Sequence, residues 1–179
     1  MKIETTQVTK LTIHDVPSMD PIAVYLEDLG PGRGKATITS SNDSWSYGWN
    51  AMGEGYDIRK FLSKCDTPYL AQKFGPDVPR TETDYDKVVE AAKKKIFETR
   101  RSDMCTKETA RRLYNETDYL LHMDVTSSDY AEAMAEIFGD EWWDCLPTVP
   151  HYQYLSLCKI IDVVKEALRN KENGEAKND

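Results

Sequence analysis

The chain has 179 residues, 40% hydrophobic and 30% charged, which is long enough for a folded core and too hydrophobic for a disordered chain. Its net charge of −8 is concentrated in residues 102–146, where eleven acidic side chains face three basic ones, and this argues against duplex nucleic acid as a partner. No apolar run approaches the roughly 20 residues that span a bilayer, and the N-terminus lacks an apolar signal core, so we expect a cytoplasmic protein.

The first fifty residues predict an antiparallel sheet. Residues 5–16, 22–29, 35–40 and 44–49 read as strands, with apolar and polar side chains alternating over much of their length. Short loops join them, and short loops require antiparallel pairing. The glycine-rich loop 29–34 resembles a phosphate-binding loop, but it leads into a strand and not a helix, so a hairpin turn is favoured.

From about residue 56 the hydrophobic period changes from two to 3.6, which predicts helices. The predicted helices cover residues 58–65, 67–75, 83–101, 106–121, 128–139 and 150–170. We therefore predict an α+β fold, with a sheet of three or four strands and about six helices packed on it. The predicted organisation is a single domain over 1–170, with a sheet part (1–52) and a helical part (56–170), followed by a flexible tail (171–179).

Three aromatic residues, Trp45, Tyr47 and Trp49, alternate along the last predicted strand and therefore share one face of the sheet. Such a row can stack single-stranded bases, or it can form the core face of the sheet. Residues 44–55 contain no Lys or Arg, which favours the core interpretation. The base-stacking alternative would also use the basic segments 93–95 and 100–101.

The candidate binding site is an acidic ridge that ends in two tryptophans. Acidic residues recur at helical spacing from Asp129 to Asp140, about one per 5.4 Å turn, which is too sparse to mimic DNA without further acidic residues. A solvated helix face is the favoured interpretation. The alternative is a docking surface for a basic partner, with the tryptophans as anchors. The full candidate set is Asp129, Glu132, Glu136, Asp140, Glu141, Trp142, Trp143 and Asp144.

No residue is assigned a catalytic, metal-binding or cofactor-binding role. The three histidines, His14, His122 and His151, have no second His or Cys at ligand spacing. The four cysteines form no CxxC pair, and the sequence has no GxSxG motif. We therefore expect a non-enzymatic protein with no metal and no cofactor.

Five stretches carry a familiar pattern: 24–39 (VYLEDLGPGRGKATIT), 45–53 (WSYGWNAMG), 61–70 (FLSKCDTPYL), 154–161 and 164–168. They resemble small early-region proteins of tailed phages and prophages of enterobacteria. Related sequences often read Cys-x-Cys-Asp-x-His-Tyr where this chain has Ser63, Cys65 and Asp66 followed by Thr67-Pro68-Tyr69, so the second Cys and the His are missing.

The resemblance implies action in the cytosol of an infected or lysogenic bacterium, where small early phage proteins often bind a host or defence-system protein. The leading hypothesis is accordingly a phage-derived, non-enzymatic binding protein with an anti-defence or DNA-mimic-like role, acting through the acidic ridge. The alternative is a single-stranded nucleic-acid-binding accessory protein of phage replication or recombination. The sequence leaves the oligomeric state open.

Overall fold

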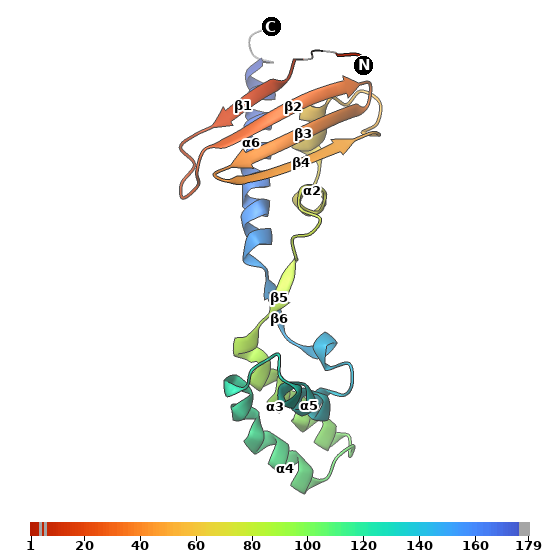
Figure 1. The fold of residues 1–179 in the computed structure, drawn as a ribbon, viewed down its shortest axis with the longest axis vertical. Coiled ribbons are helices and arrows are strands. Elements are labelled where there is room, and N and C mark those ends of the chain that lie inside the picture. Colours follow the sequence, from red (N-terminus) through yellow and green to blue (C-terminus); the bar gives the residue numbers. More distant parts are fainter. Residues whose placement is uncertain (4, 6, 176–179) are drawn as a thin grey trace. The chain divides into compact units, whose positions relative to one another are not determined.

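The computed structural model describes residues 1–3, 5 and 7–175. Its contacts divide the chain into two compact units, which we call the sheet unit (Met1–Arg80 with Tyr152–Asp179) and the helical unit (Thr81–His151) (Figure 1). The predicted α+β class is confirmed, because an N-terminal antiparallel sheet of four strands is followed by six α-helices. The single domain predicted over 1–170 stays a prediction, since a division of contacts does not measure cooperative unfolding.

The four strands of the sheet unit pair in chain order, each antiparallel to the next. They are β1 (Thr9–Ile13), β2 (Ile22–Gly30), β3 (Arg33–Ser40) and β4 (Asp43–Trp49). Val24 lies opposite Ile38 and Leu26 opposite Ala36, and all four side chains are buried. The alternation read from the sequence therefore places one apolar face toward the core.

Three helices cover the apolar face of the sheet: α1 (Ile58–Lys64), α2 (Thr67–Phe74) and α6 (Tyr152–Glu175). Figure 1 shows α6 running across the back of the four strands. Gly34 allows α1 to approach β3, because a Cβ atom at this position would lie 2.8 Å from the Cβ of Ile58. Near the C-terminal end of α1, the guanidinium of Arg169 on α6 donates two hydrogen bonds to the Ser63 carbonyl, at 3.0 and 2.7 Å.

The helical unit has its own hydrophobic cluster, formed by α3 (Tyr85–Arg101), α4 (Lys107–Glu116) and α5 (Ser128–Phe138) together with the 3₁₀ helices η1 (Thr117–His122) and η2 (Trp142–Cys145). Its chain ends pair as a short antiparallel ladder of β5 (Thr81–Thr83) and β6 (Thr148–Pro150). The prediction that the helices pack on the sheet thus describes α1, α2 and α6. The apolar stripes of α3, α4 and α5 face one another instead.

Helix boundaries follow the predicted ranges closely, with two differences. Asp57, Thr106 and Ser127 each accept a backbone N–H hydrogen bond at a helix start. The helix predicted over 106–121 ends at Glu116 and tightens into η1, which leaves Leu121 57% exposed. Helix α6 continues to Glu175, into the predicted tail 171–179, of which residues 176–179 lie outside the described residues.

Candidate functional site

The aromatic row on β4 faces the core of the sheet unit. Trp49 is only 5% exposed, and its ring packs against Phe61 and Phe74 with centroid distances of 5.5 and 5.6 Å. Its indole Nε1 donates a 3.0 Å hydrogen bond to the hydroxyl of Tyr69. Trp45 and Tyr47 are half-buried against the same cluster. The row contributes packing in the way the favoured sequence interpretation requires.

Tyr47 lies close to a basic side chain that is distant from it in the sequence. The ammonium of Lys73, on α2, lies 5.3 Å from the centroid of the Tyr47 ring. This cation–π contact joins β4 to α2. A nucleobase could reach only the partly exposed Trp45 and Tyr47, because Trp49 is covered.

The acidic ridge is exposed along α5. Asp129, Glu132 and Glu136 all lie on the solvent side of that helix. Asp129 is in the first turn, where the partial positive charge of the helix N-terminus favours a carboxylate. Glu136 pairs with Arg112 of α4, and the same guanidinium donates to Glu116 at 2.9 Å, which raises the pKa of Arg112. Glu136 is therefore partly neutralised by Arg112 and is the ridge residue that joins α5 to α4.

The helical part of the acidic ridge ends before Gly139. Its φ of +95° is a conformation that L side chains rarely adopt, and α5 stops at Phe138. Asp140, Glu141 and Asp144 are exposed, but the first two lie between α5 and η2, and Asp144 lies within the short η2. The helical spacing predicted from Asp129 to Asp140 therefore ends at Glu136, because the chain leaves the helix.

The two tryptophans of η2 have different environments. Trp142 is partly buried and packs edge-on against Tyr130, with ring centroids 5.9 Å apart. Trp143 is 58% exposed and contacts the edge of Trp142. Of the two proposed anchors, only Trp143 presents most of its ring to a partner.

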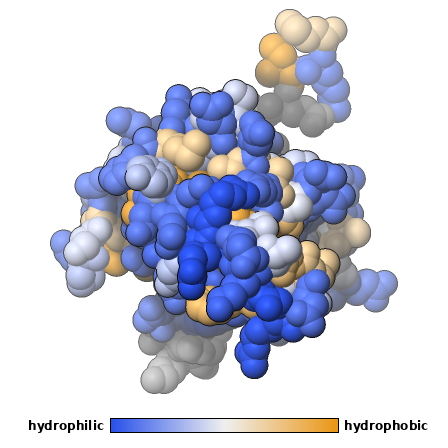
Figure 2. Space-filling view, turned by 90° about the horizontal axis from the view of Figure 1, so that it is seen from below, coloured by the Kyte–Doolittle hydropathy of each residue, from blue (hydrophilic) through white to orange (hydrophobic). Residues whose placement is uncertain are grey.

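Charge in the helical unit is segregated. Residues 85–116, which form α3 and α4, contain nine basic and six acidic side chains. Residues 117–151, which include α5, contain eight acidic side chains and no Lys or Arg. Figure 2 shows a largely hydrophilic surface on the face seen from below, broken by separate hydrophobic patches. We call residues 117–151 the acidic segment.

Between α3 and α4 lies an open apolar groove of about 410 Å³. Phe97 is 60% exposed and meets Tyr114 edge-on, with ring centroids 5.7 Å apart. Arg100 and Arg111 line the groove, and the Lys93 ammonium lies 5.2 Å from the Tyr114 ring. The sequence offered the basic segments 93–95 and 100–101 as signals for this groove, and gave no indication of the exposed aromatic pair.

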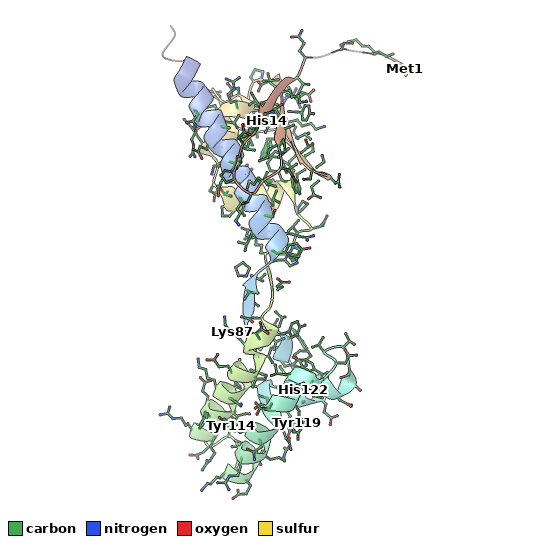
Figure 3. All side chains as sticks on the ribbon, turned by 90° about the vertical axis from the view of Figure 1, so that its left-hand side faces the viewer. Met1, His14, Lys87, Tyr114, Tyr119 and His122 are labelled. Carbon is green, nitrogen blue, oxygen red and sulfur yellow. The ribbon has the colours of Figure 1, made fainter. Side chains whose placement is uncertain are left out.

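A smaller cavity of about 190 Å³ lies near the N-terminal end of α3. Its buried wall includes Val88 and Leu120, while Tyr85 and Leu121 are exposed at its edge. Tyr130 also lines it, and the Tyr130 hydroxyl is buried without a hydrogen-bond partner among the described residues. Figure 3 labels Tyr119 and His122, two exposed residues of the adjoining η1.

Cys65 lies near the charged residues Asp66 and Lys165. Burial, followed by the nearby Asp66, raises the pKa of the Cys65 thiol, which disfavours a reactive thiolate. The neighbouring Lys165 donates a 3.0 Å hydrogen bond to the Thr67 hydroxyl, which in turn bonds to Asp162, so this polar cluster is satisfied. Among the described residues, no three His, Cys, Asp or Glu side chains converge to hold a metal ion.

A family model described as "Phage family" matches residues 1–170 of the chain. No curated protein and no solved structure matches. Within the described residues, no helix has the length and apolar character to cross a bilayer.

Proposed function

Because the chain belongs to this phage family, we propose that it is a non-enzymatic phage protein that binds a host or defence-system protein of the infected bacterium. The proposal places it in the early region of a tailed phage or prophage of enterobacteria, acting in the bacterial cytoplasm. The binding surface in this proposal is the acidic segment, including the exposed residues of the acidic ridge.

The separation of charge in the helical unit is the observation that carries this proposal. All Lys and Arg residues of this unit lie in residues 85–116. The acidic segment offers eight carboxylates, of which Glu136 pairs with Arg112 of α4 and Asp118 pairs with Lys93 of α3. Exposed apolar groups lie within it, among them Trp143, Tyr119 and Leu121. Apolar centres ringed by charge are typical of protein interfaces, and complementary charge speeds association with a basic partner.

Charge reversal tests the acidic surface. The triple variant Glu132→Lys, Asp140→Lys and Glu141→Lys should weaken capture of the partner from host lysate at 50 mM salt by about tenfold or more, because steering by opposite charge is lost. These residues are exposed and form no ion pair among the described residues. The captured protein is then purified and titrated with the wild type and with the triple variant, at low and high salt.

A matched control carries the same change of net charge on the sheet unit. Glu54→Lys, Asp77→Lys and Glu166→Lys also reverse three exposed carboxylates. This variant should bind the partner as the wild type does. Equal losses in both triple variants would show that net charge alone matters, and undiminished binding by the first would reject the acidic surface.

A second candidate function, binding of single-stranded nucleic acid, is favoured by the groove between α3 and α4. Exposed aromatic rings beside basic side chains are the arrangement that stacks bases and contacts phosphates, and Phe97, Tyr114, Arg100 and Arg111 supply both. The groove replaces the aromatic row of β4 in this hypothesis, because Trp49 is buried.

The test is an anisotropy titration with a labelled dT20 oligonucleotide. Phe97→Ala with Tyr114→Ala should weaken binding by roughly tenfold or more, because each stacked base contributes about 1–3 kcal/mol. Tyr119→Ala removes an exposed aromatic ring outside the groove and should leave binding unchanged. Absence of binding by the wild type at low salt would reject this second function.

A further inference from the structure

The groove between α3 and α4 combines apolar walls with positive charge. Phe97 and Tyr114 line it and are both exposed to solvent. The charged side chains that line it, Arg100 and Arg111, are both basic. Arg100 pairs with Asp103 at 2.9 Å, whereas Arg111 forms no ion pair among the described residues. The groove therefore offers an aromatic surface beside an unpaired guanidinium.

The same helical unit presents a side chain of matching chemistry. Trp143 on η2 is 58% exposed, so most of its surface is available for contact. Asp140, Glu141 and Asp144 lie on either side of it in the chain, are exposed, and form no ion pair among the described residues. An exposed tryptophan flanked by carboxylates is complementary to an aromatic groove flanked by arginines, in shape of contact and in charge.

Trp143 does not fill the groove of its own chain. Its ring contacts Trp142, which packs on Tyr130 of α5, and no residue of η2 lines the groove. The two surfaces are therefore separate in one copy, and each is free to meet the other surface of a second copy. A two-fold axis would form this contact twice, because the groove of each copy would receive Trp143 of the other.

We propose that a second copy of this chain binds the groove, with Trp143 seated against Phe97 and Tyr114 and its flanking carboxylates beside Arg111. The charge distribution favours this occupant, because the groove lies in residues 85–116, with nine basic and six acidic side chains, and Trp143 lies in the acidic segment. The inference goes beyond the proposed function and does not depend on it, since both sides of the contact belong to this chain.

The amount of positive charge also favours a second copy over a nucleic acid. A strand of phosphates needs several basic side chains along its path. Two guanidinium groups line the groove, and that of Arg100 is already paired with Asp103. A single tryptophan with a few neighbouring carboxylates requires less positive charge than a phosphate chain does.

Sedimentation velocity of the full chain, from about 1 μM to 1 mM, measures the self-association. The wild type should form a dimer as its concentration rises. Phe97→Ala removes a wall of the groove and Trp143→Ala removes the inserted ring, so each should weaken the dimer by about tenfold or more. Both side chains are exposed, so the fold tolerates their removal. Tyr119→Ala, which removes an exposed ring outside the groove, should dimerise as the wild type does.

A mixture of the two variants distinguishes this contact from any other. The Phe97→Ala chain retains Trp143, and the Trp143→Ala chain retains the groove, so a mixed pair forms one of the two contacts. The mixture should therefore associate more tightly than either variant alone. Exchange of charge gives a second check. Arg111→Glu should weaken the dimer, and adding Asp140→Lys and Glu141→Lys to the same chain should restore it, because opposite charges then face each other again.

Two results would overturn the inference outright. One is a wild type that stays monomeric over the whole range of concentration, and the other is a dimer that both alanine variants leave unchanged. If the wild type stays monomeric while the dT20 oligonucleotide shifts the ¹H–¹⁵N NMR signals of Ile96 and Ala110, the groove binds nucleic acid and not a second copy.

The same experiments separate this inference from the proposed function. Phe97→Ala leaves the whole acidic segment unchanged in sequence, so it should capture the host partner at least as well as the wild type does. If the dimer forms through the groove although no host protein is captured, the proposed function is wrong and the dimer stands. If charge reversal abolishes capture while the wild type is monomeric, the dimer is wrong and the acidic surface stands.

Discussion

Replacing Trp49 with alanine is expected to lower the free energy of unfolding of the sheet unit by about 3–5 kcal/mol. The side chain is nearly fully buried and lies between Tyr47, Phe61 and Phe74, with ring centroids 4.9 to 5.6 Å away. Its removal leaves a cavity and also takes the hydrogen-bond donor from the Tyr69 hydroxyl. Urea unfolding of the full chain, followed by hydrogen exchange read by mass spectrometry in the strands of the sheet unit, measures the change.

Trp143→Ala is the matched control for Trp49→Ala. Trp143 is mostly exposed, so its removal should change the free energy of unfolding by no more than about 0.5 kcal/mol. A loss below about 1 kcal/mol at Trp49 would contradict the core role of the aromatic row. That result would favour the base-stacking interpretation of Trp45, Tyr47 and Trp49.

The parts of the fold that could be predicted are those that depend on near neighbours in the chain. The alternation from Ile22 to Leu26 sets the buried face of β2, and the cap of α1 needs only Asp57 and the backbone N–H of Lys60. The β5–β6 ladder could not be read, because Thr81–Thr83 has no apolar alternation and its partner lies more than sixty residues away. An apolar stripe shows which face of a helix is buried and not which element covers it. The separate cluster of α3, α4 and α5 therefore required the structure.

The candidate site also has some features that the local sequence predicts and others that depend on contacts between distant residues. The spacing of Asp129, Glu132 and Glu136 predicted an exposed helical row, and the three residues do share the solvent side of α5. The pairing of Glu136 with Arg112 joins residues on two helices, so no local pattern could reveal it. The missing hydrogen-bond partner of the Tyr130 hydroxyl could not be predicted from the sequence either. The position of Tyr130 on the apolar stripe marked it as a core residue, while the missing hydrogen-bond partner depends on the packing of α3 and η1 around it.

Met134→Ala is expected to lower the free energy of unfolding of the helical unit by about 2–5 kcal/mol. Met134 is fully buried at the centre of the cluster that α3, α4 and α5 share, so truncation leaves a cavity there. Hydrogen exchange read by mass spectrometry reports the loss separately in residues 81–151 and in the strands of the sheet unit. Glu132→Ala, on the exposed face of the same helix, is the control and should leave exchange nearly unchanged.

The pattern of exchange decides the domain organisation. The single domain predicted over 1–170 requires that Met134→Ala also speed exchange in β2 and β3, because a cooperative domain unfolds as one. Two hydrophobic clusters without a shared residue favour the other result, in which faster exchange is confined to the helical unit. That result would make residues 81–151 a unit that can open on its own. A binding surface on such a unit could then order with its partner without disturbing the sheet.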